Sequence, residues 1–283
     1  MEDKILVDNS NVIFSKYDIE RNVKLPNKIT QDLAYLCGIL AGDGHIDNNY
    51  GGKSRNRICC GGNPKDEKEF YDIIIRNLLK DLFNIDVVPK DLGDGTYGIK
   101  FGSLGVISFL TKVIGFPRGK KYDTIKIPKL FLQDRNLVLS FVRGLFDTDF
   151  GLCLCKKYHT EPYYPQVCFD SKSKTFAKEI WQTLKFLGLD FNSKVYQVYD
   201  KDERTKAGYT ITYRFDLYGH KYFVNILRVI KLRHPKHIKK YEQWLEANKN
   251  NSKVEKLIAE ISGGFPIWPI ATSLDLNSSG LQK

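Results

Sequence analysis

The chain has 283 residues, an apolar fraction of 42% and a formal net charge of +11. This length and composition predict one large domain or two of ordinary size, and exclude a wholly disordered protein. The excess of Lys and Arg over Asp and Glu indicates a polyanionic partner, of which nucleic acid is the commonest. No stretch has the roughly 20 apolar residues of a membrane span, so we expect no membrane partner.

The cysteines and the N-terminal segment bear on the compartment. The segment is acidic at its start and has no long apolar core, so we expect no signal peptide and no secretion. The six cysteines lack the repeated spacing of a structural zinc cluster, so we expect reduced thiols, at positions 37, 59, 60, 153, 155 and 168. The expected location is the cytoplasm, the nucleoid or an organelle.

The first predicted elements precede a polar stretch. Residues 1–30 are polar with short apolar runs, and we expect a leader that packs along the domain or contacts a partner. Thr30 is a suitable helix N-cap, and apolar residues at helical spacing predict a helix that ends at Asp43. The polar stretch that follows leads to an expected strand over 57–60.

A helix, a hairpin and a second helix are expected next. Asn63 and Pro64 are typical of an N-cap and a first helical position, and predict a helix that continues to about Phe83. Asp94-Gly95 is a hairpin signal between two expected strands. The first strand of the hairpin is expected to begin at residue 87, and the returning strand to cover 97–101. The helix after the hairpin is expected over 104–114.

The second half of the chain repeats this order. A helix is expected over 133–149, and the further elements are expected at 152–157, 166–169, 174–188, 194–199, 209–217, 222–230 and 236–248. The stretch 262–283 is rich in Gly, Ser and Pro and is expected to be loosely held. We therefore divide the chain into a leader (1–30), two halves (31–131 and 132–245) and a C-terminal tail (246–283).

Matching sequences support the repeat. The strand Tyr97–Phe101 corresponds to Tyr213–Leu217, and Leu110–Ile114 corresponds to Ile226–Ile230, at one shared offset of 116 residues. The expected fold class is α+β, with tandem αββαββα units related by a pseudo-twofold axis and two antiparallel sheets.

Two related segments begin these halves, Leu36–Gly44 and Val142–Phe150. Each is apolar and ends in an acid, Asp43 or Asp149, which lie 106 residues apart (149 − 43). Each also has small residues four positions apart, which share a helix face and permit close backbone approach: Gly38 with Gly42, and Gly144 with Thr148. An acid at a helix C-terminus is disfavoured by about 0.3–1 kcal/mol. Two such acids on paired helices are reasonable where a cation or a basic ligand lies between them.

The two segments resemble the LAGLIDADG motif of homing endonucleases, and 31–245 is similar to the single-chain, two-motif form of that family. The first copy has Ala41 where the consensus has its first acid. The second copy keeps Asp147 and Asp149 but has Phe150 in place of the final glycine. The resemblance implies two packed central helices and a Mg²⁺-dependent endonuclease that cuts both strands of double-stranded DNA across the minor groove.

The resemblance also implies the catalytic groups. Asp43 and Asp149 would be catalytic and would bind Mg²⁺ together with the main-chain carbonyls of Gly42 and Thr148, since hard cations take oxygen ligands. Mn²⁺ is expected to substitute, and Ca²⁺ to bind without supporting cleavage. The alternative for either acid alone is a turn former at a helix end.

A basic residue accompanies each catalytic acid in the family. By position we expect Lys121 and Lys236, although the offset of 116 residues pairs Lys236 with Lys120 instead. The alternative is that these lysines contact phosphate and only position the DNA.

The strands are expected to read DNA. Two sheets forming a saddle would cover the helices with one face and enter the major groove with the other. The candidates for DNA contact are Arg55, Arg57, Tyr97, Lys100, Lys156, Gln166, Asp170, Tyr196 and Arg214. Because the two halves differ at these positions, we expect a long asymmetric target bound by a monomer.

The same fold could serve other functions. An RNA maturase, with intron RNA as a further partner, or a DNA-binding protein that has lost cleavage would share the fold. The two retained acids favour the endonuclease, because a pure binding protein gains nothing from them. An intein is disfavoured, since no Cys or Ser opens the chain and no His-Asn ends it. We expect a free-standing, intron-encoded enzyme.

Overall fold

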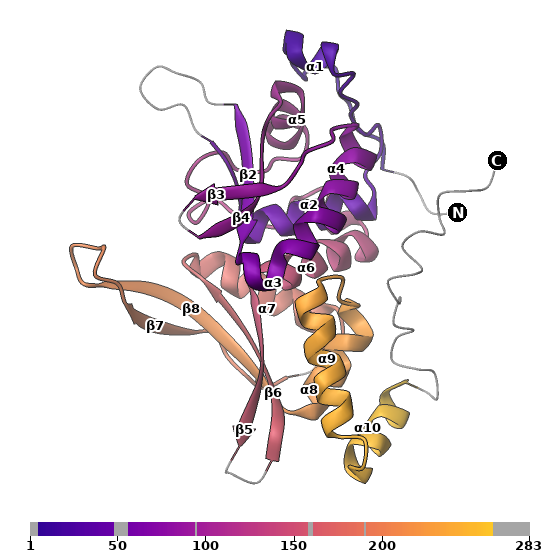
Figure 1. Cartoon of the computed structure of the whole chain (residues 1–283), viewed down its shortest axis with the longest axis vertical. Helices are drawn as coiled ribbons and strands as arrows, with labels where there is room; N and C mark the ends of the chain where they lie inside the picture. Colours follow the sequence, from indigo (N-terminus) through magenta and orange to yellow (C-terminus); the bar gives the residue numbers. More distant parts are fainter. Residues whose placement is uncertain (1–4, 48–55, 94, 158–160, 190, 263–283) are drawn as a thin grey trace, which may run out of the picture.

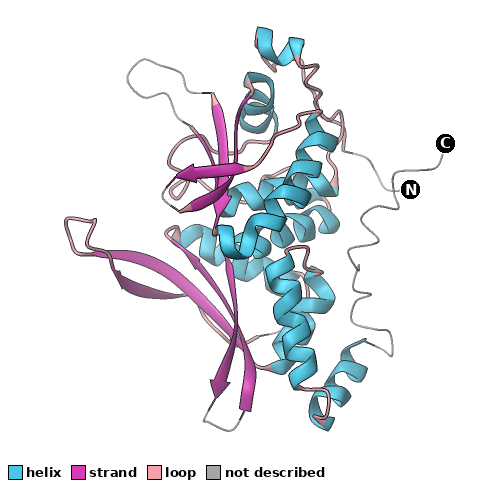
Figure 2. Ribbon diagram, viewed as in Figure 1, coloured by secondary structure: helices cyan, strands magenta, loops and turns pink. Residues whose placement is uncertain are grey.

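The computed structural model describes residues 5–47, 56–93, 95–157, 161–189 and 191–262. Helices α2 (Gln31–Gly42) and α6 (Arg135–Asp149) cross the middle of the molecule, with one sheet above them and one below in the view of Figure 1. Figure 2 shows the strands along one side and most of the helices along the other. The expected α+β architecture is confirmed.

Each half contributes one antiparallel sheet of four strands. The first sheet has the order β1-β2-β4-β3, and the second has the equivalent order β5-β6-β8-β7. The strands of the first sheet are β1 (Gly44–Ile46), β2 (Arg57–Gly62), β3 (Lys90–Gly93) and β4 (Thr96–Gly102). Those of the second are β5 (Phe150–Lys157), β6 (Glu161–Ser171), β7 (Tyr196–Lys201) and β8 (Tyr209–Tyr218). The shared order is the tandem repeat expected from the sequence.

The remaining helical segments flank the sheets. In the leader and the first half they are α1 (Lys16–Glu20), α3 (Pro64–Glu69), the π-helical η1 (Phe70–Ile75), α4 (Arg76–Phe83), α5 (Leu104–Ser108) and the π-helical η2 (Phe109–Val113). From the boundary of the halves to the tail they are the 3-10 turn η3 (Phe131–Gln133), α7 (Lys174–Phe186), α8 (His220–Ile230), α9 (Pro235–Ala247) and α10 (Ser252–Ser262). No helix in the described part of the chain has the length and apolarity needed to span a membrane.

Side-chain caps begin the central helices. Thr30 Oγ1 accepts a hydrogen bond of 3.1 Å from the Leu33 N–H, as expected of an N-cap. Asp134 Oδ1 accepts from the Asn136 N–H at 2.6 Å and from the Leu137 N–H at 3.3 Å. These caps satisfy amide groups that have no partner within the helix, and so fix where α2 and α6 begin.

The predicted glycine contact between α2 and α6 is confirmed. A Cβ added to Gly38 would lie 2.0 Å from the Phe141 carbonyl oxygen, and one added to Gly144 would lie 2.1 Å from that of Tyr35. The two contacts are related by the repeat, since each position in α2 has its counterpart 106 residues later in α6. Glycine is therefore required on both helices for the backbones to touch.

The core lies between the helices and one face of each sheet. Ile58 and Cys60 of β2 are buried, and the intervening Cys59 is on the opposite face. In the second sheet, the same alternation buries Phe169 of β6 and Phe215 of β8. One face of each sheet therefore remains uncovered by the helices, and we call it the open face.

Several expected boundaries were wrong. β1 and α1 were not expected, and α10 lies within 246–283, where no helix was expected. β3 begins at Lys90 instead of residue 87, and β6 is longer than expected. Three residues of β1, one of them a histidine, are too few to show an alternating pattern. Their strand character comes from pairing with β2.

Candidate active site at the ends of helices α2 and α6

The two motif acids lie where the central helices end and the sheets begin. Asp43 is the C-cap residue of α2, and β1 starts at the next residue. Asp149 is the last residue of α6, and β5 follows directly. A Cβ added to Gly42 would lie 2.1 Å from Thr148 Oγ1 and 3.3 Å from Asp149 Cγ, so the two helix ends touch. The structure thus brings together two acids that are 106 residues apart in the sequence.

Burial makes both acids hard to ionise. Loss of hydration, followed by repulsion from Glu67, raises the pKa of Asp43 to about 6. Loss of hydration, followed by repulsion from Asp43, raises the pKa of Asp149 to about 7. Lys121 and Lys236 oppose these increases in both cases. The helix ends therefore form a partly desolvated carboxylate pair between two ammonium groups.

Lys121 contacts the end of the first motif helix. Its Nζ donates hydrogen bonds to the carbonyl oxygens of Leu40 (3.0 Å), Gly44 (2.7 Å) and Gly42. Burial lowers the pKa of Lys121, while Asp149 and Asp43 act in the opposite direction. Lys120 is exposed. Of the two lysines left open by the sequence, Lys121 is the one beside the acids.

Lys236 reaches the same site from the second half and pairs with an acid that sequence analysis missed. Its Nζ forms an ion pair with Glu67 of α3, and both side chains are largely buried, with exposures of 19% and 10%. Glu67 Oε2 also accepts a hydrogen bond of 3.1 Å from the Asn63 N–H. A Cβ on Gly62 would overlap the Glu67 carboxylate, at 1.4 Å from Oε2. From the sequence, Glu67 is simply an acid in the first turn of a helix that begins at Asn63-Pro64. No sequence pattern connects it to Lys236.

The acids suit a hard divalent cation, whereas one expected ligand is already engaged. Two carboxylates that repel each other in a desolvated site offer the oxygen donors that Mg²⁺ or Mn²⁺ prefer. The Gly42 carbonyl accepts a hydrogen bond from Lys121, so a metal bound there would share this oxygen with the ammonium or displace it. The Thr148 hydroxyl donates to the Gly144 and Leu145 carbonyls, at 3.1 and 3.2 Å, and turns back along its own helix.

In the first sheet, the expected DNA contacts divide between the two faces. Lys100 is paired with Cys59 across the two strands, and Arg57 lies two residues before Cys59 on the same face. Both side chains therefore belong to the open face. Tyr97 shares the face of the buried Ile99, and its hydroxyl donates to Asp72 Oδ1 at 2.5 Å. The expectation that Tyr97 faces DNA therefore does not agree with its position. Arg55 lies outside the described residues.

In the second sheet, four of the expected contacts take part in hydrogen bonds or an ion pair on the open face, which we call its polar network. Arg214 pairs with Asp170 at 2.6 Å, and Tyr196 donates to Asp216. Gln166 donates to Asp216 Oδ1 at 3.3 Å and to the Tyr218 hydroxyl at 3.2 Å. Asp216 and Tyr218 were not among the expected residues, although they alternate with the buried Phe215 and Leu217 of the same strand.

Lys156 lies apart from that network. It is exposed on β5, where the pairing with β6 shifts between Cys155 and Lys157. Such a shift ends the regular alternation of faces, which is why the sequence pattern could not place this side chain.

The first acid of the second motif and the residue that departs from it both have structural roles. Asp147 is fully buried, and its Oδ2 accepts hydrogen bonds from the Tyr35 hydroxyl (2.7 Å) and the Arg233 N–H (3.2 Å). Phe150 is buried as well, stacks on Phe146 at 4.6 Å between ring centroids, and packs against Phe169 and Phe215. Asp147 therefore ties α6 to α2 of the first half and to the segment before α9, whereas Phe150 ties the end of α6 to the second sheet.

Comparison with known proteins gives distant relatives. No family model matches the chain. A protein described as a probable translation initiation factor IF-2 of Methanocaldococcus jannaschii is 28% identical over 73% of this chain, and a glutamine–fructose-6-phosphate aminotransferase of the same organism is 27% identical over 71%. The chain spans only 16% of the length of each of these relatives.

Among solved structures, similar folds are those of two homing endonucleases. I-DmoI in complex with DNA and Mn is 14% identical, with a TM-score of 0.45, over 72% of this chain and 98% of that chain. The LAGLIDADG homing endonuclease I-GzeII in complex with its DNA target is 10% identical, with a TM-score of 0.46, over 84% and 98%. At these values the likeness says nothing about function.

Proposed function

We propose that this protein is a site-specific, divalent-metal-dependent endonuclease of double-stranded DNA, of the two-motif LAGLIDADG type. The observation that carries the proposal is the meeting of Asp43 and Asp149 at the touching ends of α2 and α6, between Lys121 and Lys236. A structural role alone does not account for two buried acids that repel each other at negative helix ends. A site for phosphate and a cation does, because the cation neutralises them.

Asp43 and Asp149 would hold Mg²⁺, with the carbonyls of Gly42 and Thr148 as further donors. When bound, the metal would polarise the scissile phosphate and lower the pKa of bound water. The pKa increases of the free acids fit this role, since they show how much a compensating positive charge is needed. Mn²⁺ should replace Mg²⁺, whereas Ca²⁺ should support binding without cleavage.

The two lysines would act on the phosphate side of the site. Lys121 is held against the end of α2 by three carbonyl groups, and a bound cation would compete with it for the Gly42 carbonyl. Lys236 is held by Glu67, so its ammonium has a fixed position near Asp43. We propose that both lysines stabilise negative charge that develops on the phosphate, as a preorganised electrostatic environment does.

The open faces of the two sheets would carry the DNA. The net charge of +11 favours a polyanion, and Arg57, Lys100 and Arg214 lie on these faces. At the shared offset of 116 residues, Arg214 and Asp216 of the second sheet correspond to Gly98 and Lys100 of the first, so the two half-sites of the target should differ. We propose that the protein binds as a monomer, since one chain already contains both halves.

The distant relatives have unrelated names, and each shares about a sixth of its length with most of this chain. Neither named activity carries over to a chain that matches so small a part. We propose further that the protein takes part in homing, as an intron-encoded enzyme.

The test starts from DNA, because the target is unknown. Duplexes with a randomised segment are selected for binding in Ca²⁺, and the selected duplexes are then incubated with the protein in Mg²⁺ or Mn²⁺. Wild type should cut both strands, and the Asp43→Asn/Asp149→Asn variant should bind the same duplexes without cutting. Selected DNA that wild type binds but never cuts in any divalent metal would overturn the proposal and favour a binding protein. Selective binding of structured RNA in place of DNA would favour a maturase.

A further inference from the structure

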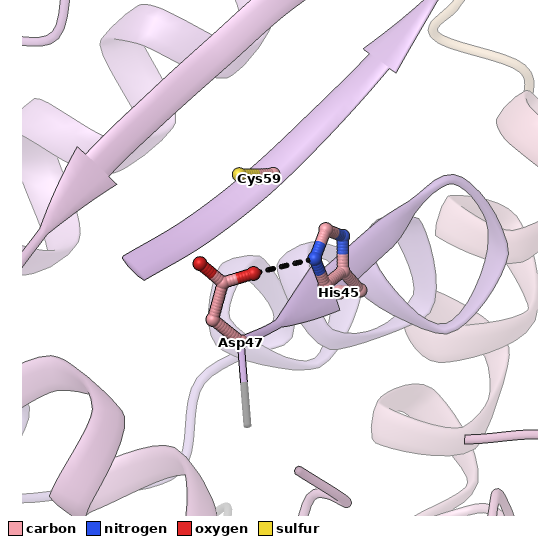
Figure 3. Close-up of side chains that lie close together, drawn as sticks. All are labelled: His45, Asp47 and Cys59. Atoms are coloured by element: carbon pink, nitrogen blue, oxygen red, sulfur yellow. Dashed lines mark hydrogen bonds and ion pairs between the residues drawn. The ribbon is translucent and has the colours of Figure 1, made fainter. Parts of the chain in front are cut away.

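Three side chains of types that can bind a metal lie close together on the open face of the first sheet. His45 of β1 and Cys59 of β2 are directly opposite each other in the sheet register, and Asp47 follows two residues after His45. One ligand atom from each of the three side chains lies within 4.8 Å of the other two. Figure 3 shows the imidazole and the carboxylate joined by a hydrogen bond of 2.8 Å, with the Cys59 sulfur on the neighbouring strand.

The backbone of this group is fixed on several sides. The Asp47 N–H donates to the Arg57 carbonyl at 2.9 Å, and the Asp47 carbonyl accepts from Arg118 Nε at 2.7 Å. The Ile46 carbonyl accepts from the Gly119 N–H at 2.8 Å. Since the strand end is held from both sides, the three side chains need to change only their rotamers to converge.

We propose that His45, Asp47 and Cys59 bind a thiophilic divalent cation of the Zn²⁺ class. An imidazole nitrogen, a carboxylate oxygen and a thiolate are the donors that Zn²⁺ takes, and three protein ligands leave a fourth position for water. Zn–ligand bonds of about 2.0–2.3 Å place tetrahedral donors about 3.3–3.7 Å apart, so the three atoms need small movements only. A sulfur donor separates this site from the all-oxygen site at Asp43 and Asp149.

Charge around Cys59 sets the proton balance of binding. Burial and the Asp47 carboxylate raise the pKa of the Cys59 thiol, while Lys100 and Arg57 act in the opposite direction. The free thiol therefore carries its proton at neutral pH, and binding of the cation as a thiolate complex releases that proton to the solvent. No change of oxidation state is involved.

The cation would also alter a predicted DNA contact. Asp47 accepts from His45 with Oδ1 and from Arg57 Nε with Oδ2, the latter at 2.8 Å. A cation on Asp47 takes up part of its negative charge and weakens its hold on Arg57. The guanidinium is then free to turn toward DNA on the open face. This consequence rests on the proposed function, whereas the metal site itself does not.

The test uses Co²⁺ as a spectroscopic probe in place of Zn²⁺. Reduced full-length protein is titrated with Co²⁺, and the thiolate-to-cobalt charge-transfer band is recorded. Wild type should bind one equivalent with this band, and Zn²⁺ should displace it. Cys59→Ser should remove the band, whereas Cys153→Ser should keep it, because Cys153 is an exposed thiol of the other sheet.

Further variants separate this site from the proposed catalytic site. His45→Gln and Asp47→Asn should weaken Co²⁺ binding by about tenfold or more, since changes even to the outer partners of a metal site cost that much. The Asp43→Asn/Asp149→Asn variant should keep the band even though its cleavage is lost. Absence of the band in wild type, or its survival in Cys59→Ser, would overturn the site. An equal loss of the charge-transfer band in Cys153→Ser would show that Co²⁺ binds thiols nonspecifically, and would also overturn the proposed site.

Discussion

The two motif helices end in different ways although they begin equivalent halves. At Gly44 the chain passes so close to α2 that an added Cβ would lie 2.7 Å from Leu40 Cα. At the equivalent Phe150 the backbone is extended (φ −82°, ψ 130°), and the ring enters an aromatic cluster. The pairing of the helices thus fixes the positions of the two acids, while the residues that follow are free to diverge.

The lysines differ between the halves as well. Lys121 contacts carbonyls of its own half, whereas Lys236 of the second half is held by Glu67 of the first. The site is therefore shared between the halves and is not two copies of one arrangement. Each prediction below tests one side of this comparison.

The largest effect is expected at the helix contact. Gly38→Ala and Gly144→Ala should each destabilise the protein by about 4 kcal/mol or more, because the new Cβ meets a backbone carbonyl that no rotamer change can move. The two losses should be similar, as the repeat relates them. Urea unfolding measures both, with Gly105→Ala as the control, since its Cβ would meet only the Phe14 ring at 3.0 Å. Small losses of unfolding free energy in both Gly38→Ala and Gly144→Ala would show that the helices can separate at little cost.

The next effect concerns the divergent residue. Phe150→Ala should cost about 3–4 kcal/mol, because it leaves a cavity among Phe146, Phe169 and Phe215. Phe186→Ala is the matched control, as that ring is exposed. Equal losses of unfolding free energy in the two variants would argue against a packing role for Phe150.

The acids should make stability depend on pH. The pKa of Asp149 in the folded protein is about 7, above its ordinary value of 3.8, so the folded chain keeps a proton that the unfolded chain has lost. Stability should therefore fall as the pH rises from about 4 through 7, on the order of 1–3 kcal/mol. Asp149→Asn should reduce this fall to the part that Asp43 contributes, and should be more stable than wild type at pH 8, but not below pH 4.

Urea unfolding across this pH range gives the measurement for Asp149. Asp81→Asn, an exposed acid on α4, is the control and should follow wild type at every pH. A wild-type stability that rises between pH 4 and pH 7, with the same rise in Asp149→Asn, would contradict the account of the buried pair.

A smaller effect is expected from Glu67. Glu67→Gln keeps the shape and can still accept from the Asn63 N–H, but it leaves the Lys236 ammonium without its counter-charge, so it should cost about 2 kcal/mol. Because Glu67 raises the pKa of Asp43, the acidic limb of the pH–rate profile for DNA cleavage should move to lower pH. Glu67→Asp keeps the charge, so its pH–rate profile should stay close to that of wild type. A profile unchanged in Glu67→Gln would mean that Glu67 has no influence on the site.

Much of the framework was predictable from the sequence. The caps of α2 and the glycine spacing of both motif helices are local signals, and the matching strands revealed the repeat. The Glu67–Lys236 pair was not predictable, since it joins positions 169 residues apart that only the packing of α3 on α9 brings together. Tyr97 was placed on the wrong face because alternation shows which residues share a face, but not which face meets the helices. Phe150 was unexplained because its partners lie on three other elements.

The most direct test of a shared site is strand-resolved cleavage. Each strand of the selected duplex is labelled, and single-turnover rates are measured for wild type, Asp43→Asn, Asp149→Asn and the double variant. If the acids act as one site, either single change should slow cleavage of both strands nearly as much as the double change. If each single variant cuts one strand at the wild-type rate and spares the other, the halves act independently, and the account of a joint site is wrong.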